Sequence, residues 1–337
     1  MKYMSLMVLP FLALLTACSA IPKQEFSNYV TNFNSAKSTT QDIILGVWVT
    51  EESKNDGSYE QQAMLEQKLK ALNARLDALE LISKYNNILV GLASGTDPAA
   101  VQSNLMNLSE GLSSFGSNSL SSLVKSAAPY GELIASAVTL IDNAIKANEF
   151  RNAVQEAYKP VVGIVDILLQ DADDLFEIQI QYLSDDLDPE RDQIIDLRFD
   201  FQDFVNTLSS SEDVNTEISN YNNSIKLMNV KPEKRPDLIV HLPGSSHNAD
   251  ASDYNMLKLL SSQTSEHINK YNNIIDQINA LNNVKVEYKN VLKSTSQAFK
   301  NLNFAIQHEQ YVLPTDFIID VLALRKSYLK LQEAKQK

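Results

Sequence analysis

The chain has 337 residues, and its 29 basic and 42 acidic side chains give a net charge of −13. Phosphate backbones repel a chain this acidic, so nucleic acid is excluded as an expected partner. A single cysteine, Cys18, excludes a fold held together by internal disulfides.

The first 17 residues have the pattern of a signal peptide. Lys2 supplies a positive charge, and Met4–Leu15 is an apolar run too short to cross a bilayer as a permanent helix. The small residues Thr16 and Ala17 then precede Cys18, as at a cleavage site. We therefore expect residues 1–17 to be removed.

The four residues Leu15-Thr16-Ala17-Cys18 resemble the lipobox of bacterial lipoproteins. The resemblance covers about the first 20 residues and implies that the thiol of Cys18 receives a diacylglyceryl group. Cleavage then makes this cysteine the new N-terminus, whose amine is also acylated in many bacteria. Ser19 follows the cysteine directly. In enteric-type bacteria, the lipoproteins that are retained at the inner membrane usually carry aspartate at this position, so the resemblance implies that this protein is located at the outer membrane.

The mature chain is expected to comprise a lipidated tether, residues 18–24, and a body, residues 25–337. Loss of Lys2 with no acidic residue makes the mature net charge −14. The body lacks another run of about 18 uncharged apolar residues, as a spanning helix requires. We therefore expect a soluble body that is tethered only at Cys18.

Apolar periodicity predicts helices from residue 25 onward. The run 43–49 permits a continued helix or a short strand, and we favour the helix. A later series has the four-three spacing of a coiled-coil seam and is typical of a long antiparallel helix in a bundle: Leu65, Leu69, Leu72, Leu76 and Leu79.

Residues 88–147 are poor in charge and rich in small side chains, and they predict two or three shorter helices. Asp97-Pro98 has the pattern of an N-cap followed by a first helical residue, while Gly111 and Gly116 resemble helix terminators. Interior helices of a bundle and a segment that inserts into a membrane are both compatible with this composition.

Prolines suggest the next boundaries. Pro160 predicts a kink or break near Tyr158, and Asp188-Pro189 predicts the start of a helix that continues toward Met228.

Residues 230–250 form a long loop with the only strand-like run, Leu238–Leu242, and long loops are often functional. Two more helices follow, from about Ser252 to Asn301 or beyond and after Pro314. The sequence predicts an all-α, elongated multi-helix bundle with long antiparallel, partly coiled-coil helices.

Three Tyr-Asn-Asn motifs begin at Tyr85, Tyr221 and Tyr271. Their unequal spacing excludes a regular solenoid. One interpretation is a ring of tyrosines and amides at one level of the bundle, lining a pocket or contacting a partner. The other is ordinary packing, with the tyrosine hydroxyl at the rim of the core and the asparagine in solvent.

Candidate metal ligands gather in three places, each of which also has an ordinary structural explanation. Residues around the long loop can either bind a metal after folding or form an ordinary polar surface. The acidic side chains lie near predicted helix ends and fit helix caps better than a calcium loop, because a calcium loop needs a glycine. The groups are His241, His247, Asp250 and Asp253; Asp171, Asp173, Asp174 and Glu177; and Asp185, Asp186, Asp188, Glu190 and Asp192.

No sequence motif of nucleophilic, nucleotide-dependent or zinc chemistry is present, so neither catalysis nor a cofactor nor a metal is expected. The leading expectation is a non-enzymatic envelope lipoprotein whose helices bind another protein or a wall component. The alternative is a membrane-active protein with residues 88–147 as the insertion segment, resembling helical pore-forming toxins of the haemolysin BL kind in general layout only. An enzyme using His241 and His247 is the third possibility.

Overall fold

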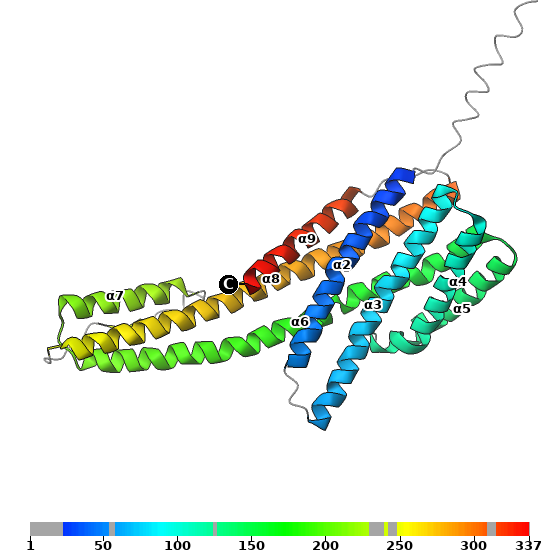
Figure 1. Ribbon diagram of the computed structural model, residues 1–337. Helices are drawn as coiled ribbons and strands as arrows, with labels where there is room; N and C mark the ends of the chain where they lie inside the picture. Colours follow the sequence, from blue (N-terminus) through cyan, green and yellow to red (C-terminus); the bar gives the residue numbers. More distant parts are fainter. Residues whose placement is uncertain are drawn as a thin grey trace, which may run out of the picture. The chain divides into compact units, whose positions relative to one another are not determined.

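A computed structural model describes residues 23–53, 58–123, 127–228, 239–241, 248–308 and 315–336. All regular structure in these ranges is helical, which confirms the predicted all-α fold (Figure 1). The elements are α2 (Lys23–Ser53), α3 (Tyr59–Ser94), α4 (Pro98–Ser114), the π-helix η1 (Phe115–Ser119), the 3₁₀ turn η2 (Leu120–Ser122), α5 (Ala128–Lys146), α6 (Phe150–Asn206), α7 (Glu212–Leu227), α8 (Ala251–His308) and α9 (Thr315–Lys335).

The chain divides into two compact units. The first unit lies within Met1–Leu175 and Val284–Ser327, and the second within Phe176–Asn283 and Tyr328–Lys337. Cys18 and the whole predicted signal peptide lie outside the described residues, and α2 begins within the expected tether, at Lys23. The run 43–49 is helical, as favoured.

Aromatic side chains join four helices in the core of the first unit. The ring of Tyr29 lies 4.7 Å from that of Phe317 and 6.3 Å from that of Phe299, which in turn lies 5.4 Å from Tyr85. These contacts connect α2 and α3 to α8 and α9. Two residues of the predicted leucine seam, Leu72 and Leu79, are fully buried, and α3 packs along α2 as expected for such a seam.

Helices α4 and α5 form an antiparallel pair that packs against α3 on one side. Asp97 caps α4 as predicted, because its carboxylate accepts a hydrogen bond from the N–H of Ala99 at 3.1 Å. Gly111 does not end the helix. A Cβ at this position would lie 2.7 Å from Leu81 Cδ2, so the glycine allows α4 to approach α3 closely.

Gly116 does not terminate a helix either, since it lies inside η1. A Cβ there would lie 3.2 Å from Ile134 Cγ2 of α5. Both glycines therefore serve close helix packing, a role that composition alone does not distinguish from termination.

Helix α6 runs without a break through Pro160 and Pro189, which corrects two predicted boundaries. An internal proline costs about 3 kcal/mol through its missing N–H and its ring. Around Pro160, Val161, Ile164 and Val165 are fully buried, and each contributes roughly 1.5–3 kcal/mol. Packing therefore outweighs the local cost of the proline.

The predicted helix toward Met228 is instead two helices, which are separated by residues 207–211. Ser211 starts α7, and its hydroxyl accepts a hydrogen bond from the N–H of Val214 at 3.3 Å. The missed signal is the run Ser209-Ser210-Ser211 followed by Glu212, which is typical of a helix N-terminus.

In the second unit α7 runs parallel to α8. Three contacts follow one another in the same order along both helices: Tyr254 to Glu217 at 3.2 Å, Ser265 to Ser224 at 2.9 Å, and Asn272 to the Leu227 carbonyl at 3.0 Å. The end of α7 and the start of α8 therefore lie about one length of α7 apart, which is about 24 Å. This separation accounts for the length of the predicted loop.

Candidate functional site

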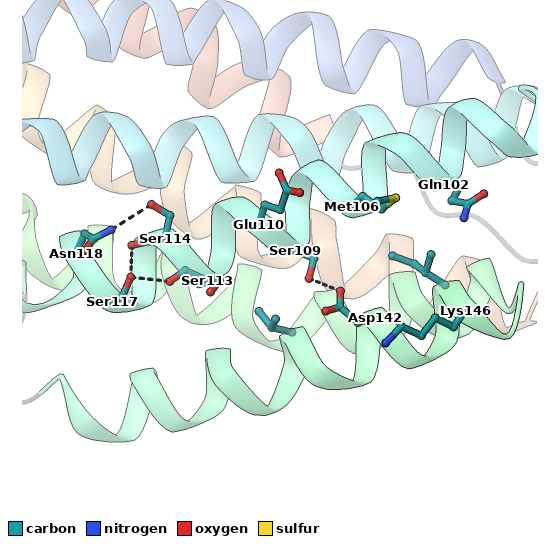
Figure 2. Close-up of a pocket in the computed structure, with 12 residues that line it drawn as sticks. Gln102, Met106, Ser109, Glu110, Ser113, Ser114, Ser117, Asn118, Asp142 and Lys146 are labelled. Carbon is teal, nitrogen blue, oxygen red and sulfur yellow. Dashed lines mark hydrogen bonds between the residues drawn. The ribbon is translucent and has the colours of Figure 1, made fainter.

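An open groove runs between α4 and α5 and continues beside η1 (Figure 2). Its volume is about 670 Å³, and a smaller hollow of about 430 Å³ shares Ser113, Ser117 and Val138 with it. The groove is lined by Gln102, Met106, Ser109, Glu110, Ser113, Ser114, Ser117, Asn118, Val138, Asp142, Ile145 and Lys146.

Hydrogen bonds fix most polar groups of the groove. Ser109 donates to a carboxylate oxygen of Asp142 at 2.7 Å, which ties α4 to α5. The Ser117 hydroxyl lies 3.0 and 3.1 Å from the carbonyl oxygens of Ser113 and Ser114. The lining contains no histidine or cysteine, so none of these serines faces an imidazole base.

The exposed sides of α4 and α5 carry few charges. One side of α4 is buried through Leu105, Leu108 and Leu112, whereas the opposite side presents serine, asparagine and Met106. Most exposed side chains of these two helices are uncharged, with Glu110, Glu132 and Lys146 as the exposed charges, and α4 has one apolar face rather than the several expected of an interior helix. Depletion of charge and enrichment of methionine are typical of protein interfaces.

The predicted cluster around the long loop has a structural role in its described part. Asp250 accepts hydrogen bonds from the N–H groups of Ser252 and Asp253 at 2.7 and 3.0 Å, and Asp253 accepts one from the N–H of Asp250 at 3.0 Å. These reciprocal bonds form a capping box at the start of α8. His241 is exposed, and His247 lies outside the described residues.

The first acidic group is divided among different partners. Asp171 forms a buried, two-point ion pair with Arg75, at 2.6 and 2.7 Å, while Asp173 binds Lys289 at 2.7 Å on the surface. Asp174 and Glu177 are exposed. Burial raises the pKa of Asp171, an effect that the hydrogen bonds from Arg75 partly offset.

Sequence reasoning missed Arg75, although a signal was available. It lies three residues after Leu72 and four before Leu79, on the side of α3 that the leucine seam assigns to the core. A lone arginine at such a position predicts a buried acidic partner.

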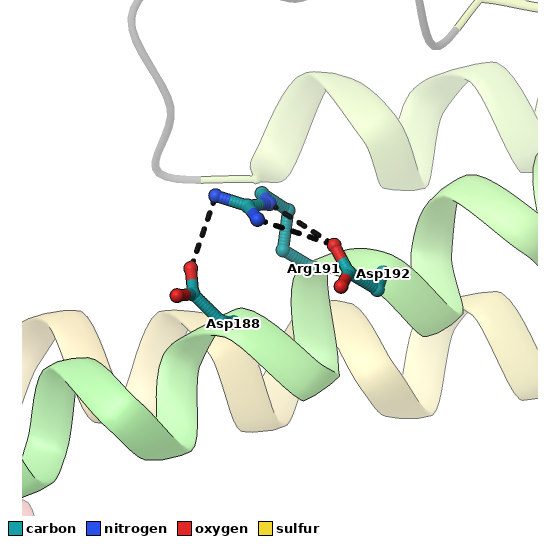
Figure 3. Close-up of polar contacts among 3 residues, drawn as sticks. All are labelled: Asp188, Arg191 and Asp192. Carbon is teal, nitrogen blue, oxygen red and sulfur yellow. Dashed lines mark hydrogen bonds and ion pairs between the residues drawn. The ribbon is translucent and has the colours of Figure 1, made fainter.

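The second acidic group lies in the middle of α6, so the interpretation as a helix cap is wrong. Arg191 lies between two of its members, with N···O distances of 3.0 Å to Asp188 and 3.2 Å to Asp192 (Figure 3). Glu190 instead lies 2.6 Å from Nδ1 of His267 on α8. Within the described residues no group of three or more histidine, cysteine or acidic side chains is arranged to hold a metal ion.

The Tyr-Asn-Asn motifs share no common role. Their tyrosines are buried, contrary to the expected position at the rim of the core, and Tyr85 belongs to the first unit whereas Tyr221 and Tyr271 belong to the second. The amide of Asn86 is fully buried and has no hydrogen-bond partner among the described residues. Asn222, by contrast, binds backbone, and so does Asn272.

None of the described helices combines the length and the apolar character needed to span a bilayer. Comparisons of the chain with protein-family models, curated proteins and solved structures gave no match.

Proposed function

We propose that this chain is a non-enzymatic binding protein of the bacterial cell envelope, anchored to a membrane through lipid on Cys18. The outer membrane is the proposed location, and a protein or a cell-wall component is the proposed partner. The predicted signal peptide and the residues around Cys18 support the anchor, and the open groove of about 670 Å³ between α4 and α5 is the observation that supports binding.

The physical argument for the groove concerns desolvation. Burying a charged side chain in an interface is costly unless it finds a partner, whereas hydroxyl and amide groups cost less and can form new hydrogen bonds. The exposed Met106 adds a flexible apolar contact at the same surface. A partner that offers apolar and neutral polar groups would bury the serine, asparagine and methionine side chains of this surface at little electrostatic cost, whereas Glu110 and Lys146 would need charged partners or contact with solvent.

Photo-crosslinking in cells tests this proposal. A crosslinking amino acid at position 106 is expected to capture one enriched partner. The matched control is position 64 on α3, because Met64 is 50% exposed and Met106 is 48% exposed, and only Met106 lines the groove. Capture of the same products at both positions, or of none, would contradict the proposed binding surface.

Insertion of residues 88–147 into a membrane predicts contact with lipid instead of a partner at position 106. In that case the unlipidated chain would release dye from liposomes, and position 106 would crosslink to lipid. If the liposomes stay intact, insertion is contradicted and the binding role is the remaining interpretation of residues 88–147.

A further inference from the structure

The segment Ile239–His241 is extended and lies against α6 and α7. The side-chain amide of Asn222 pairs with both backbone groups of Val240: its Oδ1 accepts from the N–H at 2.9 Å, and its Nδ2 donates to the carbonyl at 2.9 Å. The N–H of His241 donates to Oε1 of Gln202 at 3.0 Å.

These three hydrogen bonds hold the segment as neighbouring strands hold a strand. In an extended chain the N–H and C=O of one residue point to the same side, and those of the next residue point to the opposite side. Asn222 therefore binds one edge of the segment and Gln202 the other. The predicted strand-like run thus pairs with two side-chain amides, and no strand ladder is present in the described ranges.

Neighbouring groups of α6 and α7 help to orient both amides. The Nε2 of Gln202 donates to Asn206 at 2.9 Å, which leaves its Oε1 free for the segment. Asn222 follows Tyr221, whose ring stacks on Phe201 with 4.4 Å between ring centroids. Asn222 and Gln202 each follow an aromatic residue of this stacked pair, which belongs to the core of the second unit.

The most buried side chain of the segment is that of Val240. Val240 is 2% exposed and belongs to the apolar cluster that includes Phe201, Tyr221 and Ile225. Hydrogen bonds to backbone read no sequence, so specificity at this place is limited to a branched apolar residue.

We propose that Asn222, Gln202 and the apolar cluster beneath them form a binding site for an extended peptide of another protein. The chain's own Ile239–His241 segment occupies this site as an internal ligand. A competing peptide needs free backbone groups on both edges and a branched apolar residue at the position of Val240. Because a tethered segment has an effective concentration in the millimolar range, the partner binds only when it displaces that segment.

Amide hydrogen exchange tests the occupancy. Asn222→Leu removes two backbone hydrogen bonds, and the His241 amide, whose own bond to Gln202 remains, is expected to exchange about thirtyfold faster. The control is Asn223→Leu, which changes the exposed neighbour in the same motif and should leave this amide unchanged. If the His241 amide of the wild type exchanges only through global unfolding, the segment is a fixed part of the core, and the proposal fails.

Peptide binding tests the site directly. Val240→Asp is expected to expel the segment, so that a fluorescent peptide of residues 236–244 binds this variant saturably. The same peptide with aspartate at position 240 should not bind, and adding Asn222→Leu should weaken binding about thirtyfold.

Two results would overturn the site. The first is no binding of the peptide up to about 1 mM by a Val240→Asp variant that circular dichroism shows to be folded. The second is a wild-type dimer that Asn222→Leu dissociates, because the occupant would then be a second copy of the chain. If Val240→Asp does not fold, the exchange measurement on the wild type decides.

Discussion

At the residue scale, the ion pair between Arg75 and Asp171 gives the sharpest expectation for stability. Both side chains are 5% exposed. Asp171→Asn leaves the guanidinium buried without a counter-charge, which should lower the free energy of unfolding by about 3–5 kcal/mol. Urea unfolding followed by circular dichroism measures this loss. Replacing both partners, Arg75→Met with Asp171→Leu, should restore much of it, since no charge is then left unpaired.

Asp173 is the matched control, two residues further along α6. Its carboxylate binds Lys289 at the surface and is 59% exposed, so Asp173→Asn should cost no more than about 1 kcal/mol. The hydrogen bond from Lys289 lowers the pKa of Asp173. Its contribution is therefore present at neutral pH and lost as the pH falls below about 4. Equal losses for the two variants would contradict the assigned burial.

The comparison of these two aspartates shows where sequence reasoning reaches its limit. Helical periodicity placed both on a long helix, but it assigned neither a partner, because Arg75 is 96 residues away from Asp171. Pairing between distant helices depends on their register, which short-range patterns do not encode. The cap at Asp97 was predictable for the opposite reason, since its acceptor and donor lie two residues apart.

At the element scale, the contact between α4 and α3 depends on Gly111. Alanine favours a helix by about 1 kcal/mol over glycine, but overpacking a core costs about 1–3 kcal/mol. With a Cβ 2.7 Å from the buried Leu81, Gly111→Ala should leave stability unchanged or lower it by up to about 2 kcal/mol.

Gly131 in α5 is the control, because a Cβ there would lie 3.9 Å from Leu120, an ordinary contact. Gly131→Ala should therefore stabilise the protein by about 1 kcal/mol. Thermal unfolding of both variants measures the difference, and a gain of stability at position 111 equal to that at 131 would show that α4 does not approach α3 closely.

The errors in predicted helix boundaries have one physical cause. Proline and glycine were read as local breaks at Pro160, Pro189 and Gly111, but tertiary packing holds the helix through each of them, and Gly116 lies in the π-helix that follows the end of α4 at Ser114. The real break near residue 207 carried a weaker signal, a run of serines. Element type was therefore predictable from periodicity, whereas element ends depend on neighbours that the local sequence does not reveal.

At the scale of the whole molecule, the charge of the chain limits how it can hold a membrane. The net charge of −13 opposes attraction to anionic headgroups. One acyl chain alone gives marginal binding, but two or three add about 0.8 kcal/mol for each buried methylene. Attachment should therefore depend on lipid at Cys18 and be insensitive to salt.

Fractionation of cells tests this attachment. The wild type should remain with membranes in about 1 M salt, where charges are screened beyond about 3 Å, and should incorporate labelled palmitate. Cys18→Ser removes the thiol at which we propose the lipid, so this variant should appear in the soluble fraction without label. Ser19→Ala, which keeps the thiol, should behave as the wild type does. Release of the wild type by salt, or retention of Cys18→Ser on the membrane, would mean that a folded surface of the protein binds the membrane instead.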